Sequence, residues 1–164
     1  MITVPVALGA RSYDVLVGAG ALEAGADRLQ PLCPRGRALI AADAAALTHH
    51  GARLRAALKT AGLEPVIFQI EGGEQAKSWA GLEALVDQLL EAGMERGDSL
   101  IAFGGGTVGD LAGFASAVTK RGTRFVQIPT TLLAQVDSSV GGKTGVNTRA
   151  GKNLAGAFHQ PSLE

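Results

Sequence analysis

A short apolar run that leads directly into three consecutive glycines constrains this sequence more than any other feature. Leu100 to Phe103 have the length and composition of a buried strand, and Gly104 to Gly106 follow at once. From Thr107 to Ala115, small and apolar residues recur at helical spacing, so the segment predicts a strand, a tight turn and a helix N-terminus. The free N–H groups at such a helix start attract an anion, and glycine lets a phosphate approach the backbone.

The spacing of Gly104, Gly106 and Gly109 fits the dinucleotide-binding fingerprint. The alternative is a purely structural turn, because the chain has 23 glycines. The pattern also follows a late strand, and no acid lies at the usual distance beyond it. Asp43, which ends an earlier apolar run, is therefore the candidate partner for a ribose hydroxyl.

Strand patterns alternate with helical patterns along the chain, which favours a mainly parallel sheet. We predict an α/β fold of Rossmann-like type, with helices on both faces of the sheet, as one domain over residues 1–164. Val4–Leu8 and Tyr13–Val17 predict a hairpin that could edge this sheet. The remaining predicted strands are Arg37–Asp43, Pro65–Ile70, Leu100–Phe103 and Phe125–Ile128, and the predicted helices run over residues 22–29, 44–61, 82–93 and 107–120.

Polar side chains follow several of these strands. Asp43 can accept hydrogen bonds from a ribose, or it can simply cap the helix that begins at Ala44. Pro129 stops the last strand, and the hydroxyls of Thr130 and Thr131 can donate and accept hydrogen bonds while starting the next helix. These side chains are candidates for nucleotide binding at one edge of the sheet.

The loop after residue 70 lies at the same end of the sheet as Asp43. It carries two glycines, at 72 and 73, for close approach, and it offers Glu74, Gln75 and Lys77 for hydrogen bonding. The alternative is a solvated loop whose Ser78 caps the following helix.

The stretch from Gln135 to Asn147 is dense in polar groups yet set between apolar residues. Such groups are costly to bury without partners, and their density suits a site for a small, hydroxylated, anionic molecule. Lys143 and Lys152 can supply positive charge to phosphate or carboxylate, while Asp137 and Asn153 can address hydroxyls. The alternative for each lysine is a solvated surface position.

Composition excludes several classes of partner. With 15 basic and 15 acidic residues, the chain has no broad basic face for nucleic acid or anionic lipid. No apolar run approaches a membrane span, and the N-terminus lacks the pattern of a signal peptide, so we expect a cytoplasmic protein. The single cysteine excludes a disulfide framework, and the adjacent His49 and His50 point to different helix faces and make a poor metal pair. We predict no metal site within the chain.

Two long segments carry a resemblance to a known family. Arg121–Asn147 and Gly151–Pro161 closely resemble the signature of the 3-dehydroquinate synthase family, and residues 73–78 resemble its Gly-Glu-Gln-x-Lys-Ser element. The resemblance implies a shikimate-pathway enzyme that converts the phosphorylated sugar acid 3-deoxy-D-arabino-heptulosonate 7-phosphate into 3-dehydroquinate and phosphate. It also implies catalytic NAD, a divalent metal such as zinc or cobalt, and a homodimer.

The matching motifs imply roles for individual residues. Lys143 and Lys152 would contact NAD or substrate, Asp137 and Asn153 would contact substrate, and Arg121 would reach the substrate phosphate in a neighbouring subunit. The alternative for Arg121 is a cation at the C-terminal end of a helix. The NAD-binding set implied by the resemblance is Glu74, Lys77, Gly105, Gly106, Asp110, Thr130 and Thr131, to which our interpretation of the pattern adds Asp43, Gln75, Thr107, Val108 and Gly109.

The family's metal ligands, one Glu and two His, come from a helical C-terminal domain that should begin just beyond Pro161. None of these ligands is present in the sequence, so we expect residues 1–164 to be the NAD-binding N-terminal domain of a longer enzyme, inactive alone. Two other interpretations stay open. One is a sugar-phosphate cyclase of secondary metabolism, and the other is a non-catalytic nucleotide-binding domain.

Overall fold

The computed structural model describes residues 1–71 and 73–164. Its centre is a four-stranded parallel sheet with the strand order β4-β3-β5-β6. The predicted α/β fold with a parallel sheet is therefore confirmed. The strands of this sheet are β3 (Arg37–Asp43), β4 (Glu64–Ile70), β5 (Ser99–Gly104) and β6 (Arg124–Pro129), and the helices are α1 (Ala21–Leu29), α2 (Ala44–Thr60), α3 (Trp79–Glu91) and α4 (Gly106–Val118).

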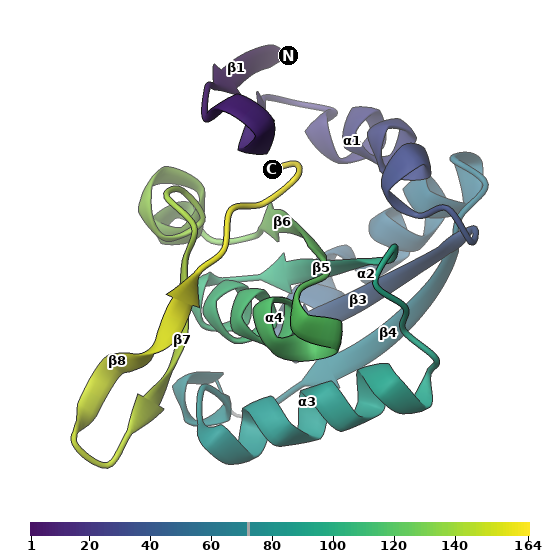
Figure 1. Cartoon of the computed structure of the whole chain (residues 1–164). Coiled ribbons are helices and arrows are strands. Elements are labelled where there is room, and N and C mark those ends of the chain that lie inside the picture. The colour runs from purple at the N-terminus through teal and green to yellow at the C-terminus, as the bar shows by residue number, and fades with distance from the viewer. Residues whose placement is uncertain (72) are drawn as a thin grey trace.

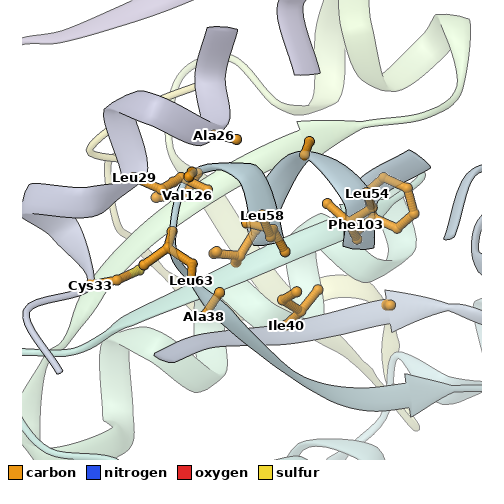
Figure 2. Close-up of a cluster of buried hydrophobic side chains, with 14 of the residues drawn as sticks. Ala26, Leu29, Cys33, Ala38, Ile40, Leu54, Leu58, Leu63, Phe103 and Val126 are labelled. Carbon is orange, nitrogen blue, oxygen red and sulfur yellow. The ribbon is translucent and has the colours of Figure 1, made fainter. Parts of the chain in front are cut away.

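Helices cover both faces of the sheet (Figure 1). Ile40 of β3 packs on the side of α1 and α2, whereas Leu39 packs on the side of α3 and α4. Because both faces are covered, the sheet strands are apolar on both sides instead of alternating with polar residues. Figure 2 shows the first of these clusters, in which Leu54 of α2 lies beside Phe103 of β5, and Leu29 of α1 lies beside Val126 of β6.

The strand order places a topological switch point between β3 and β5. The chain leaves β3 toward β4 on one side, whereas β5 and β6 lie on the other side. In open α/β sheets, ligands bind in the crevice at the carboxyl ends of strands at such a point. Here those ends carry Asp43 and Gly104, and a Cβ atom added to Gly104 would lie 2.9 Å from the Cβ atom of Asp43.

The predicted N-terminal hairpin forms, as β1 (Ile2–Val6) and β2 (Tyr13–Val17), but its position at the sheet edge was predicted wrongly. The hairpin is a separate two-stranded sheet, because the final residues of the chain occupy the outer edge of β6. Leu163 forms a parallel bridge with Val126 of β6, and Glu164 exchanges backbone hydrogen bonds with β2 (Glu164 N–H to Asp14 O, 3.0 Å). A segment this short carries no strand pattern of its own.

A second hairpin, β7 (Lys143–Thr148) and β8 (Gly151–Phe158), was not predicted. The two paired strands are rich in glycine because their backbones approach very closely. A Cβ atom on Gly156 would lie 1.9 Å from the carbonyl oxygen of Thr144. The hairpin packs against α4, where a Cβ atom on Gly113 would lie 2.3 Å from the Cγ2 atom of Thr144.

Short helical segments complete the chain. The helix predicted after Thr131 begins at Leu132, and the Oγ1 atom of Thr131 accepts a hydrogen bond from the N–H of Ala134 (3.2 Å), as expected of a helix start. Within the described residues, no helix has both the length and the apolar character needed to cross a membrane. The remaining short elements are η1 (Gly9–Arg11), η2 (Gln30–Leu32), η3 (Gly73–Ala76), η4 (Thr119–Arg121) and the π-helical η5 (Ala134–Ser138).

Candidate nucleotide and anion site

The N-terminus of α4 is the centre of the candidate site. The helix begins at Gly106, and its N-cap, Gly105, makes no side-chain capping bond. The first helical turn therefore has N–H groups, including those of Thr107 and Val108, that lack an intrahelical acceptor. Backbone donors at the positive end of a helix suit a diphosphate, so this turn fits the group predicted to bind there.

At Gly106 and Gly109, neighbouring side chains of the protein leave no room for a Cβ atom. A Cβ atom on Gly106 would lie 2.6 Å from the Oγ atom of Ser138, and one on Gly109 would lie 2.6 Å from the Oε1 atom of Gln127. At these positions a side chain would collide with the protein itself. A substitution of Gly106 would therefore disturb the packing of the protein as well as the approach of a ligand.

Asp43 is a helix cap. Its Oδ1 atom accepts hydrogen bonds from the N–H groups of Ala45 (2.9 Å) and Ala46 (3.0 Å) at the start of α2. The capping interpretation is thus confirmed. The role of Asp43 toward a ribose stays a prediction, in which the second carboxylate oxygen would be the acceptor.

Thr130 and Thr131 flank the glycine turn from β6. The N–H of Thr130 donates to the carbonyl of Gly104 (2.9 Å), and the Cγ2 atom of Thr131 would lie 3.2 Å from a Cβ atom on Gly105. Both threonines thus lie at the carboxyl end of the sheet, where the sequence predicted them.

Glu74 connects the loop after β4 to two other elements. Its carboxylate accepts hydrogen bonds from the Nδ2 of Asn147 in β7 (2.7 Å) and from the Oγ1 of Thr107 in α4 (3.0 Å). The Nζ atom of Lys152 lies 3.8 Å from the same carboxylate. The hydrogen bond from Asn147 is the main reason that the pKa of Glu74 falls below its usual range, and Thr107, Lys77 and Lys152 act in the same direction.

Lys77 lies in the same loop but is buried, with 4% of its surface exposed. Its ammonium forms an ion pair with Asp110 of α4 and donates to the Oδ1 atom of Asn153 of β8. Burial raises the pKa of the Asp110 carboxyl above its usual range, although Lys77 opposes this effect. The role of Lys77 and Asp110 toward a nucleotide stays a prediction, since their charged atoms already engage each other.

Among the described residues, Gln75 and Ser78 of this loop form no hydrogen bond with the other candidate site residues. Gln75 is exposed, and its side chain forms no hydrogen bond within the part of the chain that the structure describes. Residue 72, one of the two glycines predicted for close approach, lies outside the described residues. Ser78 accepts a hydrogen bond from the N–H of Gly81 (3.1 Å) and caps α3, as its alternative interpretation held.

A cleft of about 470 Å³ lies between the β7–β8 hairpin, η5 and α4. Asp110, Asp137, Lys143 and Asn153 line it together with apolar side chains. The structure thus brings together Asp137, Lys143 and Asn153, which are three of the five residues predicted to contact substrate or its anionic groups. Lys152 does not line this cleft and lies beside Glu74 instead.

A larger cavity of about 550 Å³ lies between α1, α2 and β6. Its lining is mostly apolar, and Thr130 is the one predicted site residue that contributes to it. We therefore place the candidate site at α4 and the smaller cleft, where the charged groups converge.

Arg121 lies at the opposite end of α4 from the glycine turn. It follows α4 in η4, and both Lys120 (φ 53°) and Arg121 (φ 63°) adopt the left-handed conformation that non-glycine residues rarely take. A helix of 13 residues is roughly 20 Å long, so Arg121 lies about that far from the phosphate-binding end of α4. The structure does not bring Arg121 together with Lys143.

Asn147 is the contact that sequence reasoning missed. It donates to Glu74, and its Oδ1 atom accepts from the backbone N–H of Asn153 (3.1 Å). Its only sequence signal was its place at the end of a polar stretch. Among the described residues, no group of three or more His, Cys, Asp or Glu side chains is arranged to hold a metal ion.

A parallel sheet with a switch point, a glycine turn and an uncapped helix N-terminus defines the class of Rossmann-like nucleotide-binding domains. Comparison with known proteins narrows the class. The sequence profile described as "3-dehydroquinate synthase N-terminal" matches residues 67–163, which is more than half of the chain. The chain therefore belongs to the 3-dehydroquinate synthase family.

Individual relatives agree with this assignment. The 3-dehydroquinate synthase of Caulobacter vibrioides is 56% identical over 162 residues, which cover 98% of this chain and 44% of that protein. ValA, the 2-epi-5-epi-valiolone synthase of Streptomyces hygroscopicus solved with NAD+ and Zn2+ bound, is similar at a TM-score of 0.84 and 35% identity, over 96% of this chain and 43% of that one. A 2-deoxy-scyllo-inosose synthase complexed with carbaglucose-6-phosphate, NAD+ and Co2+ is similar at a TM-score of 0.85 and 26% identity, over 99% of this chain and 44% of that one. The chain thus spans less than half the length of these proteins.

Proposed function

We propose that this chain is the NAD-binding domain of a 3-dehydroquinate synthase, which converts 3-deoxy-D-arabino-heptulosonate 7-phosphate into 3-dehydroquinate and phosphate. The observation that carries the proposal is the uncapped start of α4 beside a cleft that holds Lys143, Asp137 and Asn153. Since the chain spans about 44% of its Caulobacter relative, the complete reaction would also need residues from the rest of such an enzyme.

NAD supplies hydride transfer when bound, and this chain contributes binding and charge. The N–H groups of Thr107 and Val108 would hold the diphosphate, and Asp43 would accept from a ribose hydroxyl. Beside them, the ammonium of Lys143 would neutralise a phosphate or carboxylate of the substrate, and Asp137 would accept hydrogen bonds from its hydroxyls.

A divalent metal is part of the proposal for the complete enzyme, since two similar structures contain Co2+ or Zn2+. The described residues of this chain do not fit it, because they contain no group of three suitable ligands.

Arg121 is the basis for proposing a homodimer. Its distance of roughly 20 Å from the start of α4 exceeds the reach of an arginine side chain toward a phosphate bound there, which supports a contact outside its own subunit. We propose that it reaches the cleft of a second copy, so that a two-fold dimer is the active form.

Calorimetry with NAD and the 164-residue chain tests the nucleotide site. Thr107→Pro removes one N–H of the first turn, a position where helices tolerate proline, whereas Thr107→Val removes only the hydroxyl. A hydrogen bond to a charged group contributes about 1.5–3 kcal/mol, so the proline variant should bind NAD roughly 10- to 100-fold more weakly than the valine variant. Equal affinities of two folded variants would exclude the α4 N-terminus as the diphosphate site.

A second candidate is a sugar-phosphate cyclase of another pathway, which the similarity to 2-deoxy-scyllo-inosose synthase favours. The complete enzyme, assayed for phosphate release from each sugar phosphate, separates the two. A domain that binds NAD with no turnover of either substrate in the complete enzyme would favour a non-catalytic role.

A further inference from the structure

Lys77 joins three elements that are far apart in the sequence. Its ammonium contacts Asp110 of α4 and Asn153 of β8, and its carbonyl oxygen accepts a hydrogen bond from the N–H of Asn147 in β7 (2.9 Å). Only 4% of Lys77 is exposed, so these protein groups surround the side chain.

Asn153 has an unusual backbone. Its φ of 59° lies in the left-handed region, inside a strand. Asparagine tolerates this conformation better than most residues, but glycine adopts it more readily. What asparagine adds at this position is an amide with one accepting and one donating end.

The chemistry of Lys77 determines which way this amide points. An ammonium group can only donate hydrogen bonds, so the end of the Asn153 amide that faces Lys77 must be its oxygen, Oδ1. The Nδ2 group must then face away. Asn153 lines the cleft together with Asp137 and Lys143, and its Nδ2 group donates no hydrogen bond to any residue that the structure describes.

We propose that Lys77 is a positioning residue, which orients the Asn153 amide so that its Nδ2 group is a hydrogen-bond donor in the cleft. This inference rests on the proposed function in so far as the cleft holds the substrate. The ligand atom opposite Asn153 is then an acceptor, namely a carboxylate, phosphate or hydroxyl oxygen. Lys77 acts on the substrate side through Asn153.

The orientation is measurable in the wild-type chain without any ligand. In a uniformly 15N- and 13C-labelled sample, a scalar coupling across the hydrogen bond should connect the Nζ atom of Lys77 with the Cγ atom of Asn153. Lys77→Met, which keeps the side-chain length but removes the donor, should shift the side-chain amide signals of Asn153. Lys59→Met is the matched control, because Lys59 is exposed on α2, and it should leave those signals unchanged.

A missing coupling to Asn153, or unchanged Asn153 signals in Lys77→Met, would each overturn the inference. Should Lys77→Met fail to fold, the double variant with Asp110→Asn removes the buried carboxylate and allows the same comparison of the Asn153 signals. Failure of the wild-type chain to bind NAD would contradict the proposed function but leave the NMR result decisive for this inference.

Discussion

The buried pair of Lys77 and Asp110 should contribute strongly to stability. The two side chains are 5% and 19% exposed, so little water reaches either charge. Lys77→Met leaves the Asp110 carboxylate buried without its counter-ion, and breaking such a pair costs about 3–5 kcal/mol. For a domain of this size, each kcal/mol lowers Tm by roughly 2–4 °C, so we expect a loss of roughly 6–20 °C.

The double variant Lys77→Met, Asp110→Asn tests this reasoning, because it contains no buried charge at this position. It should recover most of the lost free energy of unfolding, measured by urea denaturation with an unchanged m-value.

The loss of stability caused by Lys77→Met should also depend on pH. Burial already raises the pKa of Asp110, and loss of Lys77 should raise it further, so the folded state binds the proton more tightly than the unfolded state. Stability of this variant should therefore fall as pH rises from the unfolded pKa through the folded pKa. A cost below about 1 kcal/mol, with additive effects of the two substitutions, would refute the assignment of a coupled buried pair.

Three further outcomes are expected. Asp43→Ala should cost about 0.5–2 kcal/mol of stability because α2 loses its cap, whereas Asp43→Asn should keep the cap; weaker NAD binding by Asp43→Asn alone would support the ribose contact. In the complete enzyme, an Arg121→Ala subunit mixed with a Lys143→Ala subunit should regain activity if a dimer shares its sites, and proven heterodimers without activity would place Arg121 in its own subunit. Because the pKa of Glu74 is lowered in the folded state, the stabilisation by its contact with Asn147 should be present above the unfolded pKa and disappear as pH falls through the folded pKa, which the side-chain amide signals of Asn147 will report.

The sheet could be predicted because its strands and helix starts are recognisable from short stretches of sequence. Each of the strands β3, β5 and β6 is a short apolar run, and the residue types at Asp43 and Ser78 are those that cap helices. The sequence placed Asp43, Glu74 and Lys77 at one end of the sheet for the same reason, since parallel strands bring their carboxyl ends to one edge.

The contacts of Lys77 and the β7–β8 hairpin could not be predicted, because they depend on residues that are far apart in the sequence. The ammonium of Lys77 contacts the side chains of Asp110 and Asn153, which lie 33 and 76 positions away in the sequence. No hydrophobic periodicity predicts contacts of this kind. The β7–β8 hairpin could not be predicted either, because glycines such as Gly145 and Gly156 are typical of loops. Only the structure shows that their two strands pair at very close range. Burial of Lys77 could not be predicted either, since an isolated lysine in a polar loop is ordinarily solvated.

The glycine turn before α4 is enclosed by side chains from several parts of the chain. A Cβ atom added to Gly104, Gly106 or Gly109 would collide with a side chain from a different part of the chain, respectively Asp43, Ser138 and Gln127. Gln127 in turn donates to the carbonyl oxygen of Ser139 (2.7 Å), so β6 is tied to the residue directly after η5. A turn fixed from several sides in this way has little freedom to rearrange, because a closely packed interior resists displacement. The N–H groups at the start of α4 therefore point in a set direction before any anion arrives, and binding there costs little additional ordering of the backbone.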